Sequence, residues 1–150
     1  MYHLRALGWS VEGVDLNEAS AAIARRHGLT VHTGPAEEFD AGKAFDVVHM
    51  GDVIEHVPSP RRLLDRIRRV TAPGGIVVIE TPDAGSNFAR LSLRIGALTG
   101  QPWAHAEAPM HLFEFSAPAL ARLLEAAGFT MRAVTRHGRM PFAYAVGASG

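Results

Sequence analysis

Short apolar runs alternate along the chain with segments in which apolar residues recur at helical spacing. Runs of four to six residues predict β-strands at residues 11–15, 29–32, 45–50 and 76–81. A Pro-Gly-Gly turn is predicted at residues 73–75, just before the last of these strands. Because the strands alternate with helices, the pattern predicts an open, mostly parallel α/β sheet with right-handed crossovers.

Two helices are predicted between these strands. Asn17 is the expected N-cap of a helix over residues 19–27, and Gly28 stands where that helix should stop. Ser59 and Pro60 open the second helix as N-cap and first helical residue. One face of this second helix collects the apolar residues Leu63, Leu64, Ile67 and Val70.

The alternation of predicted strands and helices ends at residue 82. Residues 82–115 are rich in Gly and Pro, with a helix expected near residues 88–98, and a long irregular insertion in a compact domain is usually functional. Ser116 is then expected to cap a helix that stops at Gly128. Two final strands are predicted near residues 129–135 and 142–146.

Composition narrows the class of protein. The chain has 150 residues, 47% of them apolar and 20% charged, which predicts one ordinary globular domain over residues 1–150. Fifteen basic and fifteen acidic residues give a formal charge of zero, so the overall field favours neither nucleic acid nor an anionic membrane. No apolar run is long enough for membrane insertion or a signal peptide, and the sequence has no cysteine. We therefore expect a soluble cytoplasmic protein.

Asp15 is the first candidate site residue, since it ends a predicted strand and precedes a helix. An acidic residue at this place in doubly wound nucleotide-binding folds accepts hydrogen bonds from ribose hydroxyls, although aspartate also caps helices. The glycine-rich loop of such folds lies about 20 residues upstream. Only Gly8 is a glycine among the residues before Asp15, so the sequence lacks that loop. Taken alone, Asp15 also admits an NAD-dependent enzyme.

Residues 45–58 carry the most specific motif, FDVVHMGDVIEHVP. This motif resembles the fourth-strand motif of class I S-adenosylmethionine-dependent methyltransferases. It is most similar to the small-molecule O-methyltransferase branch that includes the ubiquinone-biosynthesis enzymes. The resemblance runs from about Leu4 to the last strand. Further segments similar to the family occur in its order and spacing at residues 13–17, 34–39, 73–83, 110–116 and 123–129.

The resemblance implies a Rossmann-like fold that binds S-adenosyl-L-methionine and transfers its methyl group to a hydroxyl of a small-molecule acceptor. It implies cofactor contacts in three places along the chain. The matching residues are Asp15 and Leu16 in the ribose motif, Ala36 and Glu37 beside the adenine, and Met50 and Gly51 near the sulfonium.

Histidines are the candidate bases, because histidine suits removal of a hydroxyl proton at neutral pH. The resemblance makes His56 the leading candidate and His111 the second, with packing or capping as the alternative role. Ubiquinone-type relatives carry an acidic-x-x-Glu-His set that holds a divalent metal, and Asp52, Glu55 and His56 match it here. Asp52 replaces the more usual glutamate. Oxygen and imidazole ligands of this kind suit Mg²⁺ or a similar ion.

The resemblance also makes residues 82–115 a substrate-side insertion. Aromatic residues there, Trp103, His105 and Phe113, are candidates to shape the acceptor pocket, with ordinary core packing as the alternative.

The main departure from the family is at the N-terminus. The intact family begins with a strand and a Gly-x-Gly-x-Gly loop, whereas residues 2–7 here resemble the tail of the next helix. The family sheet has strand order 3-2-1-4-5-7-6, so we expect the first, central strand to be missing and two unpaired edges to result. The chain is then a piece of a longer enzyme or a degenerate member. A non-catalytic module that needs a partner is the alternative function, and homo-oligomerisation stays open.

Overall fold

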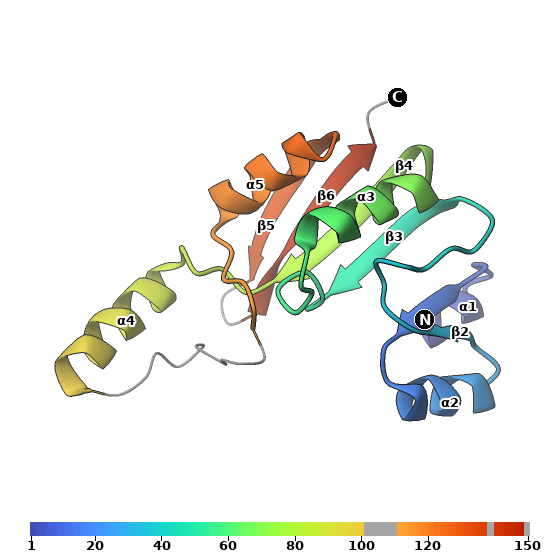
Figure 1. The fold of residues 1–150 in the computed structure, drawn as a ribbon, viewed down its shortest axis with the longest axis horizontal. Coiled ribbons are helices and arrows are strands. Elements are labelled where there is room, and N and C mark those ends of the chain that lie inside the picture. The colour runs from blue at the N-terminus through green and yellow to red at the C-terminus, as the bar shows by residue number, and fades with distance from the viewer. Residues whose placement is uncertain (101–110, 138–139, 149–150) are drawn as a thin grey trace. The chain divides into compact units, whose positions relative to one another are not determined.

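A computed structural model describes residues 1–100, 111–137 and 140–148. Its helices are α1 (Tyr2–Ala6), α2 (Glu18–Arg26), α3 (Pro60–Val70), α4 (Asn87–Thr99) and α5 (Ala117–Ala126). Its strands are β1 (Glu12–Asp15), β2 (Thr30–Thr33), β3 (Phe45–Gly51), β4 (Thr71–Thr81), β5 (Phe129–His137) and β6 (Met140–Ala148). The elements drawn in Figure 1 have the predicted types and order, and α4 is the helix expected near residues 88–98.

The strands form two separate sheets within the described ranges. In the compact unit Met1–Lys43, β1 and β2 pair in parallel. In the unit Ala44–Gly150, the strand order is β3-β4-β6-β5, with β3 parallel to β4 and β6 antiparallel to both neighbours. The family order 3-2-1-4-5-7-6, taken without its first strand, leaves one group of two strands and one group of four. The sheets β1-β2 and β3-β4-β6-β5 have this arrangement. The predicted fold class is therefore confirmed, while the single domain and its insertion at residues 82–115 stay predictions.

Helix α2 begins and ends as the sequence predicts. The Asn17 side-chain oxygen accepts hydrogen bonds from the backbone N–H groups of Ala19 (2.9 Å) and Ser20 (3.3 Å). At the other end Gly28 has a φ of +75°, a left-handed conformation that glycine adopts without strain. Both ends of α2 are therefore defined, and so are its connections to β1 and β2.

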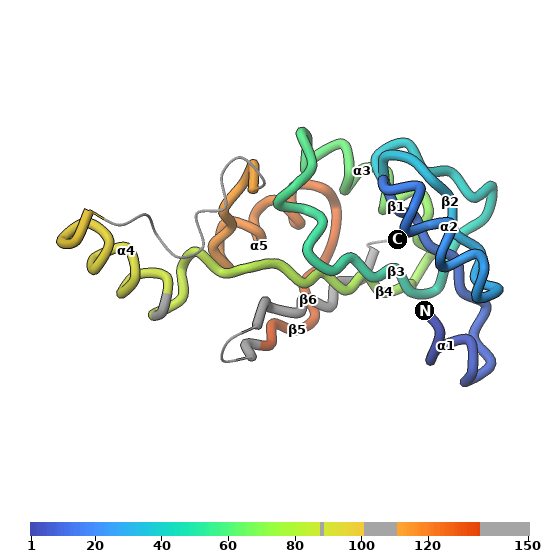
Figure 2. The backbone as a smooth tube through the Cα atoms, turned by 90° about the horizontal axis from the view of Figure 1, so that it is seen from below, coloured from blue at the N-terminus to red at the C-terminus, as the bar shows by residue number. Residues whose placement is uncertain are grey.

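In the second unit, α3 and α5 lie on the same face of the four-stranded sheet (Figures 1 and 2). The apolar face predicted for α3 is buried, as its helical spacing requires. Alternate residues of β4 are buried with it, which is the period of a strand. The core residues exposed by no more than 1% are Ile54, Leu63, Leu64, Val77, Ile79, Leu120 and Leu124.

The Pro-Gly-Gly sequence at residues 73–75 lies inside β4 and does not precede it, so the predicted start of this strand is wrong. Phe45 pairs with Thr71, whereas Val47 pairs with Ile76, so β4 advances five residues while β3 advances two. The glycines make an irregular bulge, and pairing with β3 is already established before it.

Helix α5 is capped from outside its own sequence. Ser116 occupies the predicted N-cap position, but its side chain makes no capping hydrogen bond. Instead, the Asp83 Oδ1 atom accepts hydrogen bonds from the backbone N–H groups of Ala117 (3.2 Å) and Gly85 (2.8 Å). The predicted capping side chain is therefore wrong, because Asp83 reaches this helix from the end of β4.

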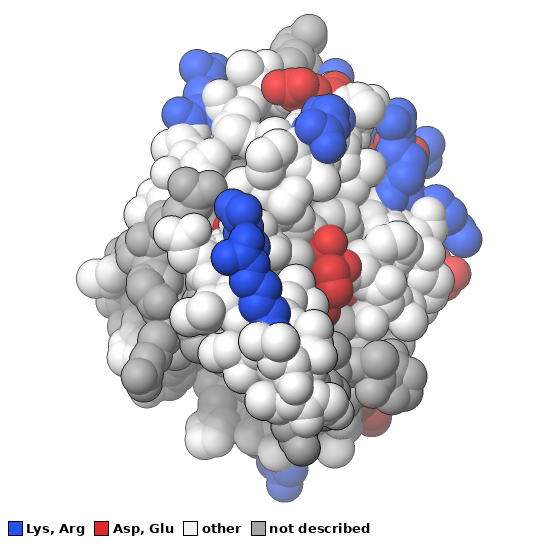
Figure 3. Space-filling model, turned by 90° about the vertical axis from the view of Figure 1, so that its left-hand side faces the viewer, with Lys and Arg blue, Asp and Glu red and all other residues white. Residues whose placement is uncertain are grey.

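One face of the molecule shows how its charged residues are distributed. On the side that carries α4, basic and acidic groups are scattered among uncharged residues (Figure 3). No helix in the described ranges has both the length and the apolar character to cross a membrane. Two candidates for the acceptor pocket, Trp103 and His105, lie outside the described residues.

Candidate functional site

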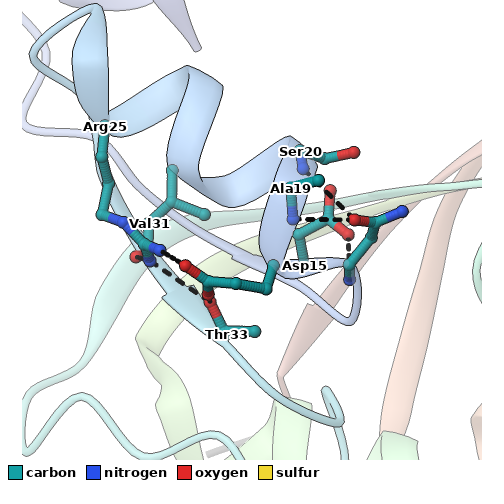
Figure 4. Close-up of polar contacts among 8 residues, drawn as sticks. Asp15, Ala19, Ser20, Arg25, Val31 and Thr33 are labelled. Atoms are coloured by element: carbon teal, nitrogen blue, oxygen red, sulfur yellow. Dashed lines mark hydrogen bonds and ion pairs between the residues drawn. The ribbon is translucent and has the colours of Figure 1, made fainter.

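Asp15 ends β1 with its carboxylate half-buried. Its Oδ1 atom accepts a hydrogen bond from the Asn17 backbone N–H at 2.8 Å (Figure 4). Because Asn17 makes the capping bonds of α2, Asp15 is not the cap of that helix. The carboxylate stands at the carboxyl end of a parallel strand, which is where open α/β sheets bind their ligands. The geometry therefore fits the predicted ribose-binding role, which stays a prediction.

The carboxyl end of β2 is held by α2. The Thr33 hydroxyl donates to Glu18 Oε2 at 2.5 Å and accepts from Arg25 Nη1 at 3.2 Å (Figure 4). Arg25 also donates to the Val31 carbonyl at 2.8 Å. The Thr33 hydrogen bond and then Arg25 hold the pKa of Glu18 below its usual range. This network fixes the point at which the chain leaves β2.

The loop after β2 carries the residues predicted to lie beside the adenine. Ala36 and Glu37 are both half-buried in this loop. The Gly34 N–H donates to the Asp15 carbonyl at 3.1 Å, which ties the start of the loop to the end of β1. Leu16, the other residue of the ribose motif, is 75% exposed. These predicted ligand residues thus gather at the carboxyl ends of β1 and β2.

In the second unit, the chain turns sharply as β3 ends. Met50 is buried, so a ligand would meet its backbone, and Gly51 is exposed. Asp52 follows with a φ of +49°, a left-handed conformation that is uncommon for residues other than glycine. Its N–H donates to the Glu80 carbonyl at 3.0 Å. This contact directs the chain away from the sheet toward Glu55.

Glu55, His56 and His111 come together beyond the end of β3. One ligand atom from each lies within 4.8 Å of those of the other two. The rings of His56 and His111 meet edge to face, with centroids 4.8 Å apart. The structure thus brings together the two predicted catalytic histidines. Within the described residues this cluster contains His111 in place of Asp52, the third predicted metal ligand.

The carboxyl group of Glu55 is 1% exposed, and neither oxygen has a hydrogen-bond partner among the described residues. Burial is the main cause that raises its pKa above the usual range, and the charge of Asp52 raises it further. The Glu55 backbone N–H, the Thr81 hydroxyl and His56 act in the opposite direction, but no described group meets hydrogen-bond geometry with the carboxylate. An unpartnered buried carboxylate is costly, so the position favours a proton or a bound cation.

Backbone hydrogen bonds hold the segment that carries His111. The N–H groups of Leu112 and Phe113 donate to the Glu55 carbonyl at 2.9 Å and 3.1 Å. A further backbone bond of 2.9 Å ties the same segment to the residues that follow β4. Main-chain contacts therefore hold the segment of His111 against Glu55, the residue next to His56.

The sequence prediction missed one charged neighbour of this cluster. Glu114 Oε1 lies 3.4 Å from His111 Nδ1. The two residues are three apart in a segment that is neither helix nor strand, so no periodic pattern marks the pair. In the same segment, the rings of Phe113 and Phe115 stack with centroids 5.8 Å apart. The acceptor-shaping role of Phe113 stays a prediction.

Parallel strands with polar residues at their carboxyl ends define a doubly wound α/β protein of the nucleotide-binding type. A family model described as a methyltransferase domain matches residues 2–134. The chain therefore belongs to the methyltransferase domain family, and the class I S-adenosylmethionine-dependent methyltransferase resemblance of residues 45–58 is confirmed. This assignment replaces the NAD-dependent interpretation of Asp15.

Curated relatives match part of the chain. It is 35% identical over 86 residues to a ubiquinone biosynthesis O-methyltransferase of Aromatoleum aromaticum, covering 52% of this chain and 37% of that protein. A protein of the same name from Roseobacter denitrificans is 39% identical over 82 residues, covering 50% and 33%. The matched part thus spans about a third of these relatives' length.

Solved structures match almost the whole chain. The 1,6-didemethyltoxoflavin-N1-methyltransferase of Burkholderia thailandensis has a TM-score of 0.72 and 22% identity, covering 99% of this chain and 65% of that one. The magnesium protoporphyrin IX methyltransferase of Synechocystis has a TM-score of 0.75 and 14% identity, covering 98% and 68%. At such identities the likeness shows a shared fold.

Proposed function

We propose that this chain is part of an S-adenosylmethionine-dependent methyltransferase that methylates a hydroxyl group of a small-molecule acceptor. The observation that carries the proposal is the pairing of His56 and His111, whose ring centroids are 4.8 Å apart. The O-methyltransferase names of the curated relatives support a hydroxyl acceptor. The small molecule bound in the Burkholderia neighbour supports an acceptor of that size.

The first unit fits the nucleoside part of S-adenosylmethionine. The Asn17 N–H orients the Asp15 carboxylate through Oδ1, so that Oδ2 can accept from a ribose hydroxyl. Ala36 and Glu37 would line the adenine, with Leu16 beside the ribose. In the second unit, Met50 and Gly51 would border the sulfonium through their backbone. When bound, S-adenosylmethionine supplies a methyl group activated by the positive charge on sulfur.

His56 would take the proton from the acceptor hydroxyl. A positioned general base contributes typically 10²–10⁴-fold, and an imidazole has the right basicity near neutral pH. His111, in edge-to-face contact with His56, would orient the same hydroxyl or share the proton. Residues Glu55 and Leu112 hold the two histidines together through the backbone bond described above.

Calorimetric titration with S-adenosylmethionine tests the cofactor part of the proposal. We expect Asp15→Ala to weaken binding at least tenfold, about 1.4 kcal/mol, and the control Glu125→Gln, at an exposed acid on α5, to leave it unchanged. Equal binding by wild type and Asp15→Ala would remove Asp15 from the site. A parallel chain extended upstream would show whether more sequence is needed for binding.

Transfer of a labelled methyl group to a panel of phenols, catechols and sugars tests the chemistry. His56→Ala should lower the rate about 10²–10⁴-fold, whereas His27→Ala, an exposed histidine on the first unit, should not. Cofactor binding without transfer to any acceptor in the extended chain would favour the non-catalytic module.

We further propose that Glu55, His56 and His111 hold a divalent cation. The unpartnered, buried carboxylate of Glu55 favours this second role, because a cation would supply the missing partner. One carboxylate and two imidazoles suit Mn²⁺, Fe²⁺ or Zn²⁺ better than Mg²⁺, which prefers oxygen ligands. A bound ion would neutralise Glu55 and polarise an acceptor oxygen. It would then replace His56 as the group that activates the hydroxyl, because a coordinated imidazole nitrogen cannot accept a proton.

Titration of the chain with Mn²⁺, followed by electron paramagnetic resonance, tests this donor set. His111→Ala should abolish tight binding, and Asp52→Asn should not, because Asp52 is not a member of the cluster. Loss of binding in Asp52→Asn but not in His111→Ala would restore the ligands first predicted from the sequence.

A further inference from the structure

We infer that Glu114 is a positioning residue for His111, forming a carboxylate–imidazole dyad that fixes which ring nitrogen of His111 carries the proton. The inference rests on the proposed function only in assigning His111 a chemical role. Its structural basis is the contact of 3.4 Å between His111 Nδ1 and Glu114 Oε1.

The contact determines the tautomer of His111. A carboxylate only accepts hydrogen bonds, so the Nδ1 atom that faces it must carry a proton. In the neutral ring, Nε2 then holds the lone pair and becomes the acceptor or ligand atom. The same second-partner arrangement orients catalytic and metal-ligating histidines in many enzymes. The dyad therefore serves His111 whether Nε2 accepts a proton or binds a cation.

His111 is the shielded partner of this contact, and Glu114 is the more exposed one. The His111 side chain is only 9% exposed and that of Glu114 is 32% exposed, so solvent screens the pair incompletely. Leu112 and Phe113 lie between His111 and Glu114, and their backbone bonds to the Glu55 carbonyl hold this segment in place. Glu114 therefore lies on a segment whose position is set independently of the ion pair.

Histidine ¹⁵N NMR of the chain tests the inference without cofactor or acceptor. With the ring neutral, we expect the His111 proton on Nδ1. Glu114→Ala should shift the proton toward Nε2, and Glu114→Gln should largely restore the original tautomer, because the amide oxygen can still accept. The matched control is Glu125→Gln, an exposed acid on α5. A proton on Nε2 in the wild type, or no change in Glu114→Ala, overturns the inference.

Kinetics in an active, upstream-extended chain give a second readout. Glu114→Ala should lower kcat about 10–100-fold with little change in KM, and Glu114→Gln should recover part of the loss. A merely structural role predicts instead a lower melting temperature with no change of tautomer. If NMR shows the expected tautomer change but no acceptor is methylated, the proposed function is wrong and the inference about Glu114 and His111 still holds.

Discussion

Arg68 Nη1 lies 2.6 Å from the carbonyl oxygen of Gly128, a contact between residues sixty positions apart in sequence. Arg68 stands in the last turn of α3, and Gly128 follows α5 with a φ of +81°. The guanidinium thus satisfies a carbonyl at a helix C-terminus and complements the helix dipole there. In the first unit, Arg5 donates to the Gly28 carbonyl after α2 in the same way.

Removing the Arg68 side chain should loosen α5 from α3. We expect Arg68→Ala to lower the free energy of unfolding by about 1–2 kcal/mol, the range for a hydrogen bond to a charged group. Arg69→Ala, an exposed arginine next to it, should change stability by less than about 0.5 kcal/mol. Urea unfolding followed by circular dichroism measures both, and equal losses would contradict the specific role of Arg68.

The cap of α5 predicts different effects for substitutions at Asp83 and at Ser116. Asp83→Ala should cost about 1 kcal/mol of stability, because it removes the acceptor for the Ala117 and Gly85 N–H groups. Ser116→Ala should be nearly neutral, since its side chain makes no capping bond. Thermal unfolding of the two variants decides between them: a larger loss in Ser116→Ala would return the cap to the residue that the sequence indicates.

The two glycines of the bulge in β4 should respond differently to alanine. A Cβ on Gly75 would lie 2.9 Å from the Ala72 carbonyl oxygen and 3.0 Å from that of Asp46, so Gly75→Ala should cost about 1–3 kcal/mol. Gly74 has a φ of +77° but open space around it, so Gly74→Ala should cost only about 1 kcal/mol of strain. Denaturant midpoints measure the order, and the reverse order would refute the packing of the bulge.

Acid should weaken the first unit through Glu12. Lys43 and then His32 hold the pKa of the Glu12 carboxyl below the ordinary 4.5. A lowered pKa in the folded state adds stability above the unfolded value, and this stability is lost as the pH falls through the folded value. Glu12→Gln should therefore be less stable than the wild type at neutral pH, by about 1 kcal/mol or less. The difference should vanish in acid.

Urea unfolding at a series of pH values measures this difference. The neighbouring residue Val11 offers no charge to titrate, so a conservative Val11→Ile variant serves as the control that should run parallel to the wild type at every pH. A constant gap between Glu12→Gln and the wild type, persisting in acid, would show that Glu12 acts through packing and not through charge.

Local signals in the sequence were sufficient for most of the fold. The caps Asn17 and Ser59 act within three residues of themselves, so their hydrogen bonds follow from nearest-neighbour geometry. The buried face of α3 follows from helical period alone. The start of β4 and the cap of α5 could not be predicted in this way, because both depend on partners from distant strands.

The same distinction between local signals and distant contacts applies to the candidate site. Asp15, at the end of β1, and His56, in the turn after β3, are marked by their place in a motif. His111 is marked in the same way, but its contact with Glu55 and His56 is not, because backbone bonds across more than fifty residues bring the two segments together. The contact of Glu114 with His111 depends on a segment without regular structure, whose conformation no periodic pattern encodes.

The bonds from Leu112 and Phe113 to the Glu55 carbonyl also bear on how such a chain can diversify. They lie on the C-terminal side of residues 101–110, so the anchor of His111 does not depend on the length of that stretch. Insertions or deletions between α4 and His111 can then occur while the histidine pair keeps its place. Selection can thus change the length of this connection without displacing the histidine pair.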